Sequence, residues 1–226
     1  MIGTFVNVIA VIVGSLLGML LRKGLSQQLR NTLTTGMGLC VMLIGLKGAL
    51  GTANEMLVIL SVVIGSCLGV ALKIEKRLDG LGTRLEKRFA AGDGESNFGK
   101  GFVTASLMYC VGAMAIVGSM DSGLRGDHST LFAKSILDGV SSIILASTMG
   151  LGVMLSSVAV LIYQGSIALL AQVVAPLLTE YAIQEMSAVG GVLILGIGLN
   201  MIRKEHIPVG NMLPAMFLPL ALTLWM

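Results

Sequence analysis

Charged and aromatic residues are scarce in this chain of 226 residues: Asp, Glu, Lys and Arg make up 12%, and Phe, Trp and Tyr 4%. Soluble domains carry roughly 25% charged residues. The shortage of charge, with a mean hydropathy of +0.91, excludes an ordinary soluble domain. The shortage of aromatic side chains leaves no base-stacking surface, so we expect no nucleic-acid partner.

Cysteine and histidine are also few, and they do not cluster. Cys40, Cys67 and Cys110 stand singly in apolar runs, where packing is their expected role. No group has metal-ligand spacing, so we expect no metal and no cofactor. The run Asp127-His128-Ser129 is no catalytic triad, because neighbours in sequence cannot adopt that geometry. We therefore expect no enzyme.

What the chain has in quantity is long apolar runs. A spanning helix needs about 20 predominantly apolar residues. Eight segments fit this requirement, and the split of the long run after residue 134 falls at Gly150 and Gly152. The sequence predicts an all-α, polytopic transmembrane helical bundle that forms a single domain over residues 1–226. The predicted spans are 2–21, 33–50, 56–72, 101–120, 134–152, 155–176, 186–202 and 208–226.

The basic residues predict the orientation. All 15 Lys and Arg residues except Lys47, Arg125 and Lys134 fall in three segments on one side of the predicted bundle. Basic residues accumulate in cytoplasmic loops, so we expect both termini outside. The segment 73–91 carries apolar residues at helical spacing among basic ones, which predicts an amphipathic helix on the inner leaflet. Its alternative role is a regulatory or partner-binding helix.

Small residues recur at matching positions. Gly14 and Gly18 match Gly65 and Gly69 in the third span, and Gly112 matches Gly45 of the second. Such faces let helices approach closely, and they are compatible with a homo-oligomer. A weaker sequence repeat relates the two halves of the chain, and its copies have opposite orientations in the predicted topology. An inverted repeat of that kind is typical of transporters, whereas chance matches of Gly and Leu are the alternative.

Charges near membrane depth are costly and often functional. Most of them fall in one stretch from the end of the fourth span to the start of the fifth: Asp121, Arg125, Asp127, His128, Lys134 and Asp138. Glycines between the two spans predict a structured turn there rather than a helix, and Lys134 and Asp138 open the fifth span. Lys134 and Asp138 are four residues apart, so they share a helix face and can pair. In one interpretation they and an Arg125–Asp127 pair lock the outer loop. In the other they line a vestibule in which Asp138 binds an ion or a proton.

Uncharged polar residues lie deeper in four spans: Asn7, Gln164, Asn200 and Asn211. Their amides must find hydrogen-bond partners. Bonding between helices is one expectation, and lining a solute path that runs from Asp138 past Gln164 and Asn7 is the other.

Several motifs together resemble one family. They are GTFVN (3–7), FVTASL (102–107), VGAMAIVGS (111–119), GDHST (126–130), AKSILDG (133–139) and YQGS (163–166). Across the whole chain the sequence resembles the bacterial inner-membrane proteins catalogued as domain of unknown function 554 (DUF554). The resemblance implies a multi-pass protein of the bacterial plasma membrane, often described as a transporter. It implies no substrate and no site residues.

Two functions follow as hypotheses. The first is a transporter or channel for an ion or small polar solute, with Asp138 as the binding or coupling carboxylate. The second is a membrane scaffold or regulatory subunit that acts through the 73–91 helix and the small-residue faces. In both, the lipid bilayer is the main partner. The two hypotheses differ in whether Asp138 faces a hydrated site or a packed, neutralised pair.

Overall fold

The computed structural model describes residues 1–22, 26–78, 80, 98–111, 113–174, 176, 178–203 and 206–223. Every regular element in these ranges is helical, as the sequence predicts. In chain order they are α1 (Ile2–Arg22), α2 (Gln27–Ala49), α3 (Glu55–Ala71), α5 (Phe98–Cys110), α6 (Ala113–Leu124), α7 (Ser129–Met149), α8 (Leu151–Leu169), α9 (Ala171–Val174), α10 (Glu180–Ile202), the 3₁₀ helix η1 (Val209–Phe217) and α11 (Leu218–Thr223).

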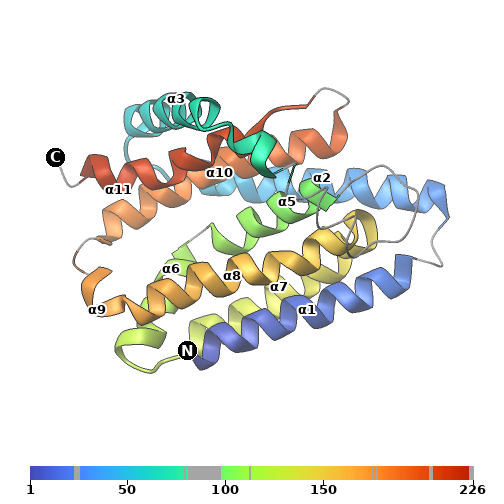
Figure 1. The fold of residues 1–226 in the computed structure, drawn as a ribbon, viewed down its shortest axis with the longest axis horizontal. Helices are drawn as coiled ribbons and strands as arrows, with labels where there is room; N and C mark the ends of the chain where they lie inside the picture. Colours follow the sequence, from blue (N-terminus) through green and yellow to red (C-terminus); the bar gives the residue numbers. More distant parts are fainter. Residues whose placement is uncertain are drawn as a thin grey trace.

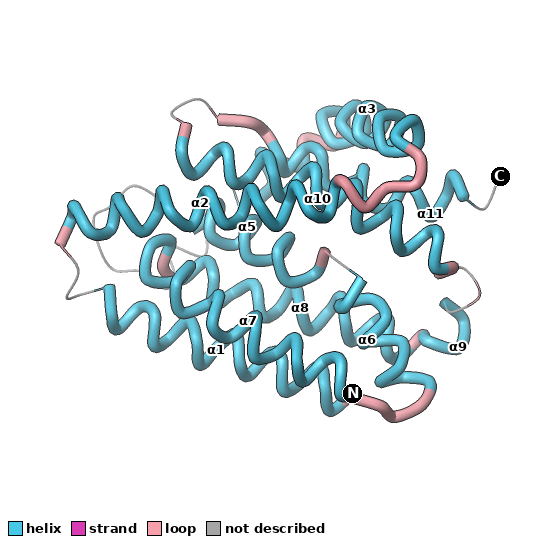
Figure 2. The backbone as a smooth tube through the Cα atoms, turned by 180° about the vertical axis from the view of Figure 1, so that it is seen from behind, coloured by secondary structure: helices cyan, strands magenta, loops and turns pink. Residues whose placement is uncertain are grey.

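The long helices run back and forth along one direction, and they form two groups (Figure 1). In the first group α1 packs on α7 and α8, and α8 also packs on α5 and α6. In the second group α2 packs along α10, while α3 packs on η1 and α11. Figure 2 shows the same division from behind. The two groups touch along a seam where α5, α6 and α7 meet α2 and α10.

Length and composition identify the helices that can cross a membrane. Among the described residues α1, α2, α7, α8 and α10 are long and apolar enough. The pair α5 and α6 counts as a sixth span if its 59° bend is taken as a break within one span. The shorter apolar segments are α3 and residues 209–223. The structure is therefore a helical membrane bundle with five or six candidate spans, and the count of eight stays a prediction.

Several helices begin earlier than the apolar runs that predicted them. The Ser26 hydroxyl accepts a hydrogen bond from the Leu29 amide, so α2 begins at Gln27. The Thr179 hydroxyl accepts one from the Ala182 amide at the start of α10. Such N-caps satisfy amides that a helix leaves unpaired. The helix ends thus follow capping, whereas the predicted boundaries followed hydropathy.

The predicted fourth span, 101–120, corresponds to two helices, α5 and α6, whose axes differ by 59°. The prediction of a non-helical turn from Gly118 onward was wrong, because α6 continues through Asp121 to Leu124. The turn at Gly150, in contrast, separates α7 from α8 as predicted, and its φ of 75° suits a residue without a side chain.

The predicted amphipathic helix falls mostly outside the described residues. Of 73–91, the structure describes 73–78 and residue 80, and it places a helical turn over 74–78. The amide of Glu75 in this turn donates to Asn211 Oδ1 at 3.0 Å, and Glu75 Oε2 accepts from the Asn211 amide at 3.1 Å. These bonds fasten the turn after α3 to η1.

Candidate functional site

The pair Lys134 and Asp138 lies on the buried face of α7. Lys134 is 6% exposed and Asp138 is 5% exposed. The Lys134 Nζ atom lies 2.8 Å from Asp138 Oδ2 and 2.9 Å from Oδ1. The i, i+4 spacing therefore produces the predicted ion pair, and the pair is buried in an apolar bundle rather than at its surface.

Two amide side chains complete this group from neighbouring helices. Asn7 on α1 donates from Nδ2 to Asp138 Oδ2 at 2.9 Å and to Gln164 Oε1, on α8, at 3.4 Å. Both amide residues are fully buried. We call Asn7, Lys134, Asp138 and Gln164 the Asp138 cluster. It joins three helices that are far apart in sequence, and it brings together residues that the sequence placed on one path.

Close packing of α1 on α7 holds the cluster in place. A Cβ atom on Gly14 would collide with the carbonyl oxygen of Gly139, and one on Gly18 with that of Ile143. The backbones can approach so closely because neither glycine has a side chain. Since Gly139 follows Asp138 directly, this contact fixes the height of the carboxylate relative to Asn7.

The other predicted packing glycines serve the second group of helices. A Cβ atom on Gly65 would collide with the backbone of Ala215, and one on Gly69 with that of Asn211. α3 therefore lies directly against η1. Gly112 lies outside the described residues.

Hydrogen-bonding capacity around the cluster is not used up. Asn7 Oδ1, Gln164 Nε2 and the Thr4 hydroxyl are buried and have no hydrogen-bond partner among the described residues. Thr4 lies one helical turn before Asn7 on α1, and its side chain is fully buried as well. Buried polar atoms are normally paired, and each unpaired one carries a free-energy cost. An acceptor, a donor and a hydroxyl are thus available for a polar species beside the Asp138 carboxylate.

A second polar layer supports the backbone of Asp138. The Ser142 hydroxyl donates to the Asp138 carbonyl at 2.7 Å, and it lies 2.8 Å from the Tyr109 hydroxyl of α5. This chain of bonds links the cluster to α5.

The polar loop at the same end of the bundle is arranged differently from the prediction. Arg125 lies 3.9 Å from Asp121, so the expected Arg125–Asp127 pair is replaced by a pair one helical turn apart. Both side chains reach the surface, at 78% and 29% exposure. Asp127 instead accepts a hydrogen bond from the Ser129 amide at the start of α7, and this bond lowers the pKa of Asp127 below its usual range.

His128 connects this loop to the chain start. Its Nδ1 atom lies 2.9 Å from the Ser122 hydroxyl, which also accepts from the Met1 amino group at 3.3 Å. The loop therefore lies over the first turn of α1, above Thr4 and Asn7. Of the six charged or titratable residues predicted in this region, only Lys134 and Asp138 belong to the buried cluster.

The remaining predicted residues, Asn200 and Asn211, lie at the opposite end of the bundle. The Asn200 side chain makes two hydrogen bonds to the backbone of Ile207: Oδ1 accepts from the amide at 2.7 Å, and Nδ2 donates to the carbonyl at 2.8 Å. Asn211 holds Glu75, as described above. Both amides hold loops in place, and neither touches the Asp138 cluster.

Sequence reasoning missed a second buried carboxylate, Glu185 on α10. It is fully buried, and it accepts hydrogen bonds from the Thr52 hydroxyl at 2.6 Å and the Ala53 amide at 2.7 Å. The bonds fasten the α2–α3 loop. Because the predicted span began at residue 186, Glu185 was counted as a loop residue. Its position one turn into an N-capped helix was the signal that could have found it.

The structure offers no ready metal centre in the ranges it describes. No three His, Cys, Asp or Glu side chains there are placed to hold a metal ion together. The described cysteines are free thiols, with Cys40 and Cys67 exposed and Cys110 buried. The chemistry available at the Asp138 cluster is therefore that of a carboxylate, an ammonium group and two amides.

Comparisons with known proteins place the chain. The model of the family described as "Protein of unknown function (DUF554)" matches residues 2–224. The chain is 32% identical to the uncharacterized membrane protein YdfK of Bacillus subtilis (strain 168), over 97% of this chain and 94% of that protein. It is also 32% identical to the uncharacterized protein YqgA of Escherichia coli (strain K12), over 98% of this chain and 96% of that protein. No solved structure matches significantly. The chain is a helical membrane protein that belongs to the DUF554 family.

Proposed function

We propose that the protein is a transporter or channel that moves an ion or a small polar solute across the bacterial plasma membrane. Asp138 is its binding or coupling carboxylate, and Asn7, Gln164 and Lys134 act with it. The observation that carries the proposal is the buried Asp138 cluster, with unpartnered amide atoms beside the carboxylate. The proposed topology has eight spans, both termini outside and the basic segments inside.

The energetics of burial support a functional role for the cluster. Charged groups in a membrane bundle are expensive and commonly mark ion or proton pathways. A pair kept only for packing needs its own partners and nothing more. Here Gln164 Nε2 and Asn7 Oδ1 remain unpaired at full burial. An arrangement with spare donors and acceptors suits a site that exchanges partners during a cycle.

The geometry also suggests how Asp138 works. Its Oδ2 atom accepts from both Lys134 and Asn7. A proton or cation that reaches the carboxylate competes with the Lys134 ammonium group, which then needs another partner. When the Lys134–Asp138 ion pair breaks or re-forms, the position of α7 against α1 changes. Occupancy of the site is thereby coupled to the arrangement of the two helices. The loop between α6 and α7, residues 125–128, lies above Thr4 and is the entry side in this mechanism.

The test is flux in proteoliposomes that contain the purified protein. Protons, monovalent cations and small anions are screened with dyes or isotopes, and wild type is compared with Asp138→Asn. We expect the variant to lose at least about nine-tenths of the flux. Glu55→Gln is the matched control, because Glu55 is an exposed carboxylate at the start of α3, and it should keep the wild-type flux.

Asp138→Asn leaves Lys134 buried without its counter-charge, so this variant can fail to fold. The double variant Lys134→Gln with Asp138→Asn leaves no unpaired buried charge, so it tests the role of Asp138 even where the single variant does not fold. If this folded double variant moves solute at the wild-type rate, the proposed role of Asp138 is wrong. If wild type moves none of the tested solutes, the scaffold hypothesis or an organic substrate outside this screen takes its place.

A further inference from the structure

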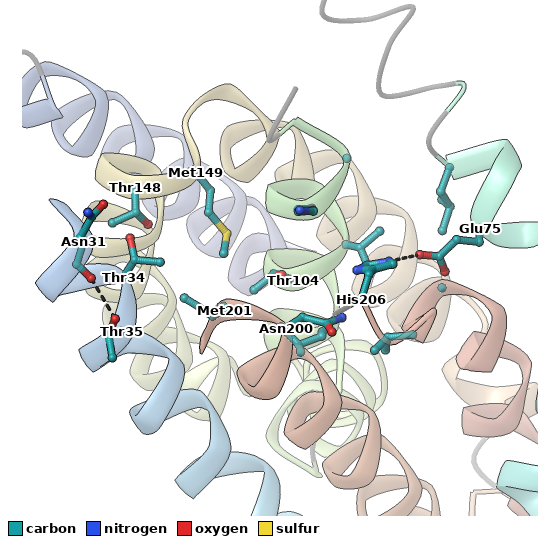
Figure 3. Close-up of a pocket in the computed structure, with 17 residues that line it drawn as sticks. Asn31, Thr34, Thr35, Glu75, Thr104, Thr148, Met149, Asn200, Met201 and His206 are labelled. Atoms are coloured by element: carbon teal, nitrogen blue, oxygen red, sulfur yellow. Dashed lines mark hydrogen bonds and ion pairs between the residues drawn. The ribbon is translucent and has the colours of Figure 1, made fainter. Parts of the chain in front are cut away.

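A cavity of about 600 Å³ opens at the end of the bundle opposite the Asp138 cluster (Figure 3). It lies in the seam between the two helix groups. The start of α2, the start of α5 and the ends of α7 and α10 line it. Its volume is in the range of small-molecule sites. The cavity is far too large for a bare ion, so an organic solute is the fitting class of ligand.

Hydroxyl and amide side chains supply the polar lining. They are Asn31, Thr34, Thr35, Thr104, Thr148 and Asn200. In Figure 3 the α2 residues face the cavity from one side, and His206 with Glu75 closes the other side. Met149, Met201 and Ile197 form apolar wall between them. Such a lining fits a ligand with hydroxyl groups and a short carbon skeleton.

Thr104 is a threonine of the cavity lining whose hydroxyl makes no hydrogen bond with any residue the structure describes, and the residue is 4% exposed. Thr148 differs, since its hydroxyl donates to the Leu145 carbonyl at 2.9 Å. A buried threonine usually bonds to its own helix or to a neighbour. Thr104 therefore offers a donor and an acceptor to a ligand in the cavity.

The charges around the cavity favour an anion. Lys100 lines it, is exposed, and forms no ion pair with the described part of the chain. Glu75 is the acidic residue in the lining, and its carboxylate is already used. It lies 2.8 Å from His206 Nε2 and accepts from the Asn211 amide. A ligand carboxylate can pair with Lys100, whereas a cation finds no free carboxylate among the lining residues.

We propose that this cavity binds a small hydroxylated organic anion, with its carboxylate on Lys100 and a hydroxyl group on Thr104. The inference rests on the proposed transport function and names its cargo. The cargo site and the Asp138 cluster lie at opposite ends of the bundle. Movement of the two helix groups along their seam would open the cavity to either side, with Asp138 as the coupling site.

Equilibrium binding to the purified protein in detergent tests the ligand class. The probes are glycerate and lactate, with glycerol as the neutral analogue and ethanolamine as the cationic one. We expect at least one of the carboxylates to bind at least about tenfold tighter than glycerol or ethanolamine. Lys100→Gln and Thr104→Val should each weaken its binding about tenfold. The controls are Lys47→Gln and Thr32→Val, which lie outside the cavity lining and should bind within about twofold of wild type.

A second measurement works without knowing the cargo. In a background of Cys40→Ser, Cys67→Ser and Cys110→Ala, a single Thr104→Cys is labelled with anionic and cationic methanethiosulfonate reagents. We expect the ratio of anionic to cationic labelling rates to exceed that of an exposed Thr32→Cys by about fivefold, the size of effect expected from one nearby charge at a hydrated surface. Adding Lys100→Gln should bring the two ratios together.

The outcomes separate this inference from the transport proposal. Equal labelling ratios at residues 104 and 32, or binding that ignores Lys100→Gln, would overturn the anion site. Ion flux that depends on Asp138 would then still support the transport function. Carboxylate binding that depends on Lys100, without flux of that probe or any ion, would keep the site and overturn transport.

Discussion

Replacing Asp138 by Asn and Lys134 by Gln, singly and together, measures how strongly the two residues depend on each other. The side chains of Lys134 and Asp138 are 7% and 8% exposed, and the Lys134 Nζ atom lies within 3 Å of both Asp138 carboxylate oxygens. Asp138→Asn removes the counter-charge of Lys134, and Lys134→Gln does the same for Asp138. The double variant leaves no buried charge at the site, and the new amides can still bond to Asn7.

The expected magnitudes follow from burial. Removing one partner of a buried ion pair typically costs about 3–5 kcal/mol, because the other charge is left uncompensated. Two such losses that did not interact would add to at least about 6 kcal/mol. A neutral pair avoids the unpaired charge, so the double variant should lose only about 1–3 kcal/mol. The coupling free energy between the two positions should therefore be at least about 3 kcal/mol.

The assay is reversible unfolding in mixed detergent and SDS micelles, followed by the loss of helical circular dichroism. The four proteins form a double-mutant cycle, and circular dichroism before unfolding verifies that each one starts with the same helix content. Additive losses, with a coupling near zero, would refute the reasoning, since they would mean that the two charges are solvated independently.

Three further predictions concern packing, a buried carboxylate and pH. Gly14→Ala should lower the free energy of unfolding by about 1–3 kcal/mol because its Cβ atom meets the α7 backbone. Gly36→Ala, with nothing within 4 Å, should raise it by up to about 1 kcal/mol in the same assay. Glu185→Ala should lower the free energy of unfolding by about 1.5–3 kcal/mol and speed hydrogen exchange in the α2–α3 loop. Gln184→Ala, which loses one exposed hydrogen bond, should change the stability and the exchange rate little. Equal effects of the two substitutions would contradict the role of Glu185 in holding this loop. Asp127 has a lowered pKa, so its hydrogen bond from the Ser129 amide stabilises the start of α7 at neutral pH and is lost as pH falls through that pKa. NMR titration should find the pKa of Asp127 below that of Asp in a peptide. Hydrogen exchange of the Ser129 amide should become faster only in acid.

Much of the fold follows from hydropathy, because only helices satisfy the backbone inside lipid. The apolar runs predicted each long helix, and the spacing of Lys134 and Asp138 predicted their pairing. Helix ends were less predictable, since polar caps such as Ser26 and Thr179 extend the helices beyond the apolar residues.

The candidate site was predicted only in part. The sequence indicated that Asn7 and Gln164 lie near Asp138, but their hydrogen bonds depend on how three helices pack. Glu185 was missed because it lies just before the apolar part of its helix. The cavity at the other end could not be predicted either, because Thr104 and Lys100 line it together with residues of α2, α7 and α10 that are distant in sequence.

The central claim is that solute movement depends on the buried carboxylate, and the most direct measurement is flux through the folded, charge-neutral double variant. Wild type, Glu55→Gln and Lys134→Gln with Asp138→Asn are reconstituted in equal amounts into the same vesicles. The account predicts equal flux for the first two and less than about a tenth of it for the third. Wild-type flux through the double variant would contradict the account.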